Sequence, residues 1–165
     1  MHDSDPGRVP GRSLDPEPMA ARKEPQTLVE YTEGDDASAF AMMLGGLIEA
    51  NVAGRPEKRA DFDSLKARVG IQVDDIDESV TLDFRAGKLK VSNGLKRDRK
   101  ITIRTDADTV MMLSNLAIGP FGMPVYFDTV GRGIVAKLLT GGLRIDGMLS
   151  NIPTLNQVTR VFSVR

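Results

Sequence analysis

The order of hydrophobic and polar residues divides the chain into an unpatterned start and a patterned remainder. Residues 1–34 carry five of the nine prolines, mixed charges and few bulky apolar side chains. Such a segment buries too little surface to offset the entropy of ordering it. We therefore expect a disordered tail over residues 1–34 and a single folded domain over residues 35–165, which is long enough to bury one core.

The first half of the domain changes from a helical to a strand period. Apolar residues from Phe40 to Val52 fall at helical spacing after two aspartates that are favourable N-cap residues, and a short charged helix is expected over 56–68. From Ile71 onwards the apolar positions alternate with polar ones, which is typical of strands joined by short turns. The expected strand positions are 71–73, 80–84, 89–91 and 101–105.

The second half returns to helices. Asp106 is placed to cap a helix, and the glycines and prolines of 119–124 exclude regular structure there. Another helical stretch contains 134–139, residues 141–147 are expected to form a last strand between glycine turns, and an amphipathic helix begins near Pro153. An antiparallel meander with one polar face, covered by helices on the other, is the α+β arrangement that this order predicts.

Composition excludes several chemistries. The chain has no Cys, and its only His is His2, so the predicted domain cannot assemble a Ser–His or Cys–His pair or a histidine metal site. The acidic turn at 74–78 lacks the Gly and Glu of a calcium loop. Residues 131–136 match the GxGxxA pattern, but position 151 is Asn where a nucleotide fold has an acid, so close helix packing is the favoured interpretation. We expect no enzyme activity, no metal and no cofactor.

Charge and hydropathy limit the partners. The net charge is −1, and the basic stretch from Lys88 to Lys100 contains no aromatic residue, so no nucleic acid is expected. That stretch could meet phosphates of coenzyme A, lipid headgroups or an acidic partner, although a solvated sheet edge explains it more simply. The longest apolar run, Phe40 to Ile48, is nine residues and far below the ~20 that span a bilayer. The start of the chain is unlike a signal peptide, so we expect a soluble cytoplasmic protein.

Two motifs resemble the sterol carrier protein 2 (SCP2) family. The run Ile101-Thr102-Ile103-Arg104-Thr105-Asp106-Ala107-Asp108, followed by Val110 to Leu113, is similar to the strand-to-helix passage of that family. The run Leu138-Leu139-Thr140-Gly141-Gly142-Leu143-Arg144-Ile145-Asp146-Gly147 is similar to its Gly-Lys-Leu-Lys-Ile-x-Gly strand. The resemblance covers residues 40–165. It departs from the family at Gly142, where a basic residue is common, and at the longer Pro-rich insertion over 117–128.

The resemblance implies a five-stranded, mostly antiparallel sheet covered on one face by helices. It also implies a noncatalytic carrier that holds a sterol, fatty acid or fatty acyl-CoA in an apolar tunnel between the two layers. The partner would be that ligand, together with a second copy of the chain or a lipid-metabolising enzyme. The lining residues would be Val80, Leu82, Phe84, Leu89, Val91, Ile101, Ile103, Met111, Leu113, Ile134, Leu138, Leu155 and Phe162, with a portal at Phe121, Met123, Tyr126 and Phe127.

Two alternatives stay open. One is an interaction or oligomerisation module whose interior is completely filled, in which case the apolar loop over 119–127 would contact a partner. The other is an accessory domain of an enzyme that acts on acyl-CoA or steroids. A few bulky side chains decide whether the space between the layers is a tunnel or an ordinary core.

Overall fold

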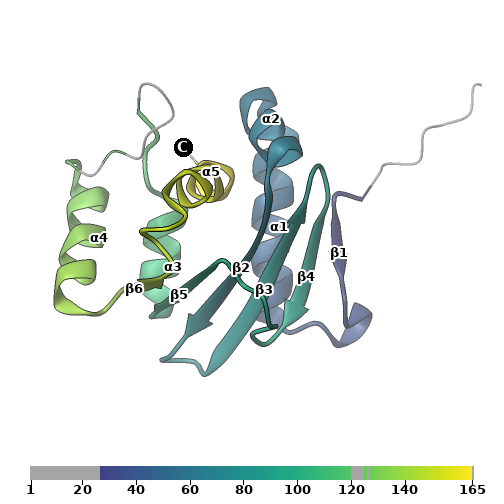
Figure 1. The fold of residues 1–165 in the computed structure, drawn as a ribbon, viewed down its shortest axis with the longest axis horizontal. Helices are drawn as coiled ribbons and strands as arrows, with labels where there is room; N and C mark the ends of the chain where they lie inside the picture. The colour runs from purple at the N-terminus through teal and green to yellow at the C-terminus, as the bar shows by residue number, and fades with distance from the viewer. Residues whose placement is uncertain (1–26, 120–124, 126, 165) are drawn as a thin grey trace, which may run out of the picture.

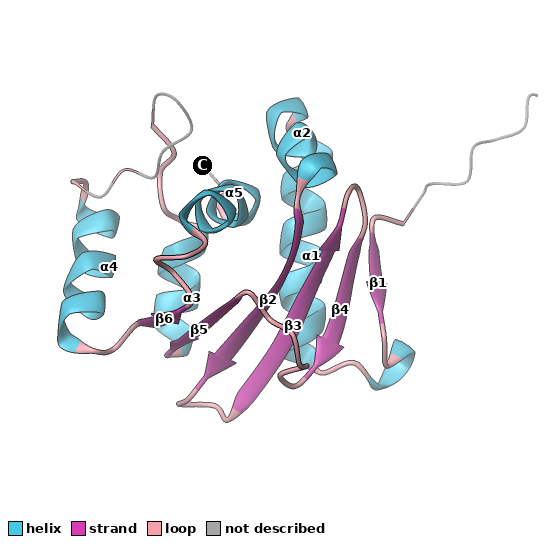
Figure 2. Cartoon of the chain, in the orientation of Figure 1, coloured by secondary structure: helices cyan, strands magenta, loops and turns pink. Residues whose placement is uncertain are grey.

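A computed structural model describes residues 27–119, 125 and 127–164. Its strands form one sheet in the order β1-β4-β3-β2-β5-β6, with helices gathered on one side of it (Figures 1 and 2). The strands are β1 (Val29–Tyr31), β2 (Lys66–Val73), β3 (Glu78–Arg85), β4 (Leu89–Asn93), β5 (Ile101–Thr105) and β6 (Arg144–Asp146). The helices are η1 (Gly34–Asp36, a 3-10 turn), α1 (Ala39–Gly54), α2 (Pro56–Ser64), α3 (Ala107–Ser114), α4 (Thr129–Thr140) and α5 (Ile152–Phe162).

The α+β fold with helices over one face of a sheet is confirmed, and the strand count is corrected from five to six. The additional strand is β1, which pairs parallel to β4 with Val29 opposite Leu89. It lies in the segment that was expected to belong to the tail, so the structure differs from the predicted boundary at 34. Three residues are too few to give a recognisable strand period, and Val29 is held by pairing and burial rather than by local pattern. The rest of the predicted tail, 1–26, lies outside the described residues.

The sheet is mixed rather than a simple meander. β2, β3 and β4 are antiparallel neighbours, but β5 joins the other side of β2 in parallel, with Val69 opposite Ile101. β6 then pairs antiparallel to β5. The charged helix predicted over 56–68 ends at Ser64, because Ala67 and Val69 enter the ladder with β3.

Alternation along the strands separates an apolar inner face from a polar outer face. Val69, Ile71, Leu82 and Ile103 are buried toward the helices, while the residues between them are mostly polar. Helix α1 packs on β1, β3 and β4. Ser38, rather than the preceding aspartates, caps this helix by accepting a hydrogen bond from the Ala41 amide at 3.1 Å.

Two glycines test how tightly the backbone is constrained. Gly147 follows β6 with φ +82°, and a Cβ there would lie 2.2 Å from the Lys100 carbonyl oxygen. Gly46 in α1 faces open space.

We expect Gly147→Ala to lower the free energy of unfolding by roughly 2 kcal/mol or more, because both the backbone conformation and the contact are incompatible with a side chain. Gly46→Ala should raise it by about 0.5–1 kcal/mol. Urea unfolding of both variants checks the pair, and equal effects would contradict the backbone geometry described for Gly147.

Candidate ligand cavity

An apolar cavity of about 290 Å³ lies between the inner face of the sheet and the helices α3, α4 and α5. The sheet contributes side chains from β2, β5 and β6, whereas β3 and β4 contribute none. The lining residues are Ile71, Ile103, Val110, Leu113, Leu116, Ile134, Val135, Leu138, Leu143, Ile145, Met148, Leu155, Val158, Thr159 and Phe162.

The wall offers almost nothing for a polar ligand to bind. Thr159 is its single polar residue, and its hydroxyl already donates to the Leu155 carbonyl at 2.9 Å. Buried polar groups of a ligand would therefore lose their hydrogen bonds with water without replacement. The cavity suits hydrocarbon, which needs no directional partner.

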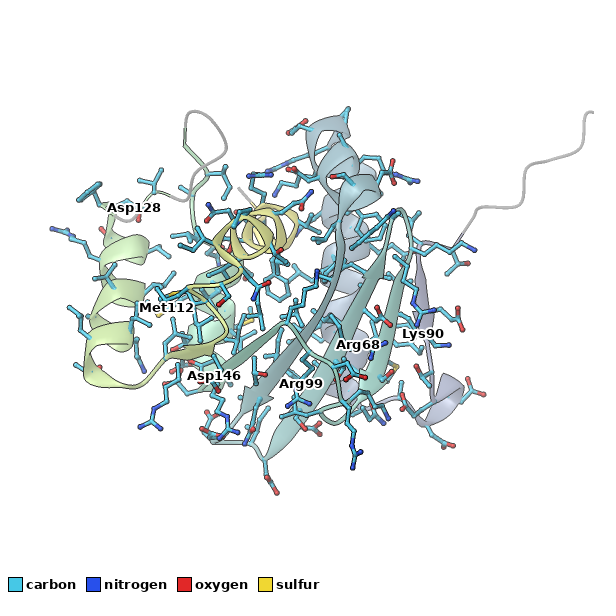
Figure 3. The ribbon with its side chains drawn as sticks, in the orientation of Figure 1. Arg68, Lys90, Arg99, Met112, Asp128 and Asp146 are labelled. Carbon is cyan, nitrogen blue, oxygen red and sulfur yellow. The ribbon has the colours of Figure 1, made fainter. Side chains whose placement is uncertain are left out.

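Helix α4 closes one side of the cavity, and its main contact is with α3. Asp128 begins the helix by accepting a hydrogen bond from the Gly131 amide at 2.6 Å. A Cβ at Gly133 would lie 2.5 Å from the terminal methyl of Met112, so the glycine lets α3 and α4 approach closely. Figure 3 shows Met112 between these two helices. The GxGxxA pattern therefore lies within a packed helix, as the favoured interpretation held.

An ion pair fastens the other end of α4 to the start of α3. The Lys137 ammonium lies 2.5 Å from a carboxylate oxygen of Asp106, which also caps α3 by accepting from the Thr109 amide at 2.8 Å. The bond from Lys137, assisted by the hydroxyl of Thr109, lowers the pKa of Asp106 to about 2. The same bond raises the pKa of Lys137. Both side chains are partly exposed, so the pair positions α4 more than it stabilises the domain.

Helix α5 forms the opposite wall and is held at its C-terminal end by α1 and α2. Asn51 donates to the Val161 and Phe162 carbonyls, and Arg55 donates to that of Val164 at 2.6 Å. Lys58 is buried and donates to the Ser163 carbonyl. Burial, followed by the nearby Arg55, lowers the pKa of Lys58 to about 8. These donors satisfy the carbonyls that a helix end leaves free.

On the α2 side, Arg160 forms a two-bonded ion pair with Asp61, at 2.8 and 2.6 Å. That pair adds a side-chain link between α5 and α2 to the bonds at the helix end. The wall formed by α5 is therefore fixed to the α1–α2 part of the domain.

The structure places six of the predicted lining residues around the cavity: Ile103, Leu113, Ile134, Leu138, Leu155 and Phe162. Six others lie in the core and do not line it: Val80, Leu82, Phe84, Leu89, Val91 and Ile101. Met111 points to solvent with 53% of its surface exposed, and Phe127 with 91%. Phe121, Met123 and Tyr126 lie outside the described residues.

Nine lining residues were not anticipated: Ile71, Val110, Leu116, Val135, Leu143, Ile145, Met148, Val158 and Thr159. Signals existed for some of them, since Ile71 alternates in a strand and Val110 falls on an inner helical face. The hydrophobic pattern of the sequence does not reveal that α1 covers β3 and β4. The open space therefore lies over the other half of the sheet.

Other functional signals lie away from the cavity or are absent from the described residues. The basic side chains from Lys88 to Lys100 lie in the turn before β4, on β4 and in the loop after it, and none of them lines the cavity. Within the part of the chain that the structure describes, no three acidic or histidine side chains come together as metal ligands. No helix in that part is long and apolar enough to cross a bilayer.

The ion pair between α3 and α4 gives a pH-dependent prediction. Asp106→Asn keeps a capping side chain but removes the charge that binds Lys137, so the free energy of unfolding at neutral pH should fall by less than about 1 kcal/mol. The folded-state pKa of Asp106 lies below its usual 3.8. Its contribution is therefore complete above about pH 4 and is lost as pH falls toward 2.

Urea unfolding from pH 7 to pH 2 measures this difference between the wild type and the variant. Asp108→Asn, also in the first turn of α3, is the control, since Asp108 forms no salt bridge among the described residues. A stability difference that stays constant down to pH 2 would contradict the role given to Asp106.

Comparisons with known proteins agree with this geometry. The model of the SCP-2 sterol transfer family matches residues 47–122. Among solved structures, a UbiJ-SCP2 ubiquinone synthesis protein is similar with a TM-score of 0.52 and 16% identity, over 74% of this chain and 90% of that one.

A second similar structure is the inverting sec-alkylsulfatase Pisa1 from Pseudomonas sp., with a TM-score of 0.53 and 11% identity over 78% of this chain. The chain spans only 17% of the sulfatase. No curated protein matches it by sequence. The resemblance to the SCP2 family is thus confirmed over residues 47–122, where the family model matches, and the fold is similar to that of a solved SCP2 protein.

Proposed function

We propose that the chain is a noncatalytic carrier that binds an apolar ligand in the cavity between β2, β5, β6 and the helices α3, α4 and α5. The observation that carries the proposal is the composition of the cavity wall, which is hydrocarbon apart from one satisfied threonine. Ligand pockets usually add a few convergent polar groups that fix orientation, and this wall offers none. Affinity would come from burying methylene groups, at roughly 0.8 kcal/mol each.

The ligand class follows from the same wall. A fatty acid, the acyl part of an acyl-CoA or a sterol would place hydrocarbon inside and keep its polar end at the opening. Leu138 lines the cavity and is 38% exposed, which supports an opening beside α4. A site without polar contacts would discriminate weakly between chain lengths, which fits a carrier better than a selective enzyme.

The catalytic alternative has little support. The chain contains no Cys and a single His at position 2, so the domain has no residues for a Ser–His or Cys–His pair. An accessory role beside an enzyme is the second candidate, because a similar fold occupies part of an alkylsulfatase chain. A completely filled interaction module is less well supported, because the space under α4 is not filled by side chains.

Displacement of a fluorescent fatty acid by unlabelled fatty acid, acyl-CoA and sterol tests the carrier. Delipidated protein should bind with roughly micromolar affinity. Val135→Phe fills the cavity from α4 and should weaken binding by about tenfold or more while leaving the domain folded. The matched control is Leu139→Phe on the same helix, at a position that is 81% exposed and outside the lining.

The control should bind like the wild type. Folded, delipidated wild-type protein that binds none of the three competitors would overturn the carrier proposal. If the two phenylalanine variants bind the fatty acid with equal affinity, the fatty acid binds elsewhere in the domain and not in this cavity.

A further inference from the structure

The outer face of the sheet, on the side away from α1, gathers much of the positive charge of a chain whose net charge is only −1. Strand alternation and register place these side chains there, because their neighbours in the sequence are buried inward. In Figure 3, Arg68, Lys90 and Arg99 lie over the strands. The basic residues of this face and of its loop are Lys66, Arg68, Arg85, Lys88, Lys90, Lys96, Arg97, Arg99, Lys100, Arg104 and Arg144.

The two ends of this face differ in how the charge is compensated. Over β2, β3 and β4, three of the cations have acidic partners: Asp83 binds both Arg68 and Arg85, and Glu30 lies 3.3 Å from Lys90. Over β5 and β6 they do not. Arg99, Lys100, Arg104 and Arg144, called the basic stripe below, form no salt bridge within the part of the chain that is described.

The register makes the stripe energetically unfavourable in the isolated domain. Arg104 and Arg144 are directly opposite each other on antiparallel strands, and both are exposed. Like charges at such a position destabilise a strand pair. Asp146 pairs in register with Thr102 and forms no salt bridge with either arginine. An external anion would relieve this repulsion.

One member of the stripe, Arg99, is also held in place rather than freely solvated. A Cβ at Gly70 would lie 2.6 Å from the Arg99 Cδ and 2.9 Å from a methyl of Leu95, so the glycine lets the loop after β4 lie against the sheet. Arg99 Nε donates to the Thr102 hydroxyl at 3.2 Å, and its terminal nitrogen donates to the Lys96 carbonyl. Thr81 binds the same loop through the Gly94 carbonyl and the Lys96 amide, both at 2.8 Å. A preorganised cation such as Arg99 loses little entropy on meeting an anionic partner.

We propose that the basic stripe is a docking surface for an acidic segment, rich in Asp and Glu, of a partner protein. Charge complementarity supports this choice of partner. The stripe arginines form no salt bridge with a carboxylate among the described residues, and a guanidinium can bind a carboxylate through two parallel hydrogen bonds. This inference goes beyond the carrier proposal and does not require the cavity to be occupied, because the stripe lies on the opposite face of the sheet from the cavity.

A membrane and a nucleic acid fit this face less well. The most exposed large apolar residues of the helices, Leu139 and Met111, lie on the helical side of the sheet, so docking by the stripe would turn them away from a bilayer. On the other strands of this face, Asp83 of β3 and Glu30 of β1 lie among the cations, and their carboxylates would repel an extended polyanion.

Fluorescence anisotropy with a short fluorescein-labelled poly-glutamate peptide tests the proposal on the full chain. The double variant Arg104→Gln, Arg144→Gln should weaken binding by roughly tenfold, and added salt should weaken binding to the wild type. The control Arg59→Gln, Arg132→Gln removes the same charge from α2 and α4 and should bind like the wild type. Removing the like-charge pair should leave the thermal midpoint unchanged or raise it, so misfolding does not confound the comparison.

Two outcomes would overturn the docking surface. One is equal peptide affinity in both double variants. The other is binding to a membrane instead of the peptide: the wild type would sediment with vesicles of about three parts phosphatidylcholine to one part phosphatidylserine. The stripe variant would not sediment with them, and the peptide would bind neither protein. Fatty-acid displacement should be unchanged in both variants, which separates failure of the docking surface from failure of the carrier.

Discussion

Burial of the inner face of the sheet is the interaction on which the rest of the domain depends. Aliphatic side chains cross this face from Leu89 on β4 to Ile103 on β5, and one layer of helices must cover them. On the β1–β4 side α1 approaches closely, because Gly45 leaves room for Tyr31, whose hydroxyl would lie 2.5 Å from a Cβ there. In that half Val80, Leu82, Leu89 and Val91 are fully buried. The other half lies under α3, α4 and α5, and it retains a cavity.

An unfilled apolar space persists only where its walls cannot collapse. Here the walls are anchored to different parts of the chain. Helix α5 is fixed at its C-terminal end by Asn51, Arg55 and Lys58, whereas α4 is fixed to α3 by the Lys137–Asp106 pair and by the contact of Gly133 with Met112. These separate anchors keep the two walls apart, which the proposed ligand site requires.

The sequence predicted the kinds of element well and the location of the open space poorly. Alternation at 80–84 and 101–105, the cap at Asp106 and the helix start near Pro153 are local signals that the structure repeats. Val80 and Ile103 have the same inward pattern, yet α1 covers one and the cavity borders the other. That difference depends on which helix lies above each strand, a tertiary relation absent from any local period. The same holds for β1, which is a strand because β4 offers it an edge.

The central claim is that ligand occupies only the half of the layer interface under α4. NMR of methyl-labelled protein titrated with a fatty acid tests it most directly, because methyl groups report contact residue by residue. We expect shifts and intermolecular contacts at Ile71, Val135 and Leu155, which line the cavity, and none at Val80 or Leu82, which are buried in the core away from it. Contacts at Val80 and Leu82, or a titration that moves no buried methyl group, would contradict the account.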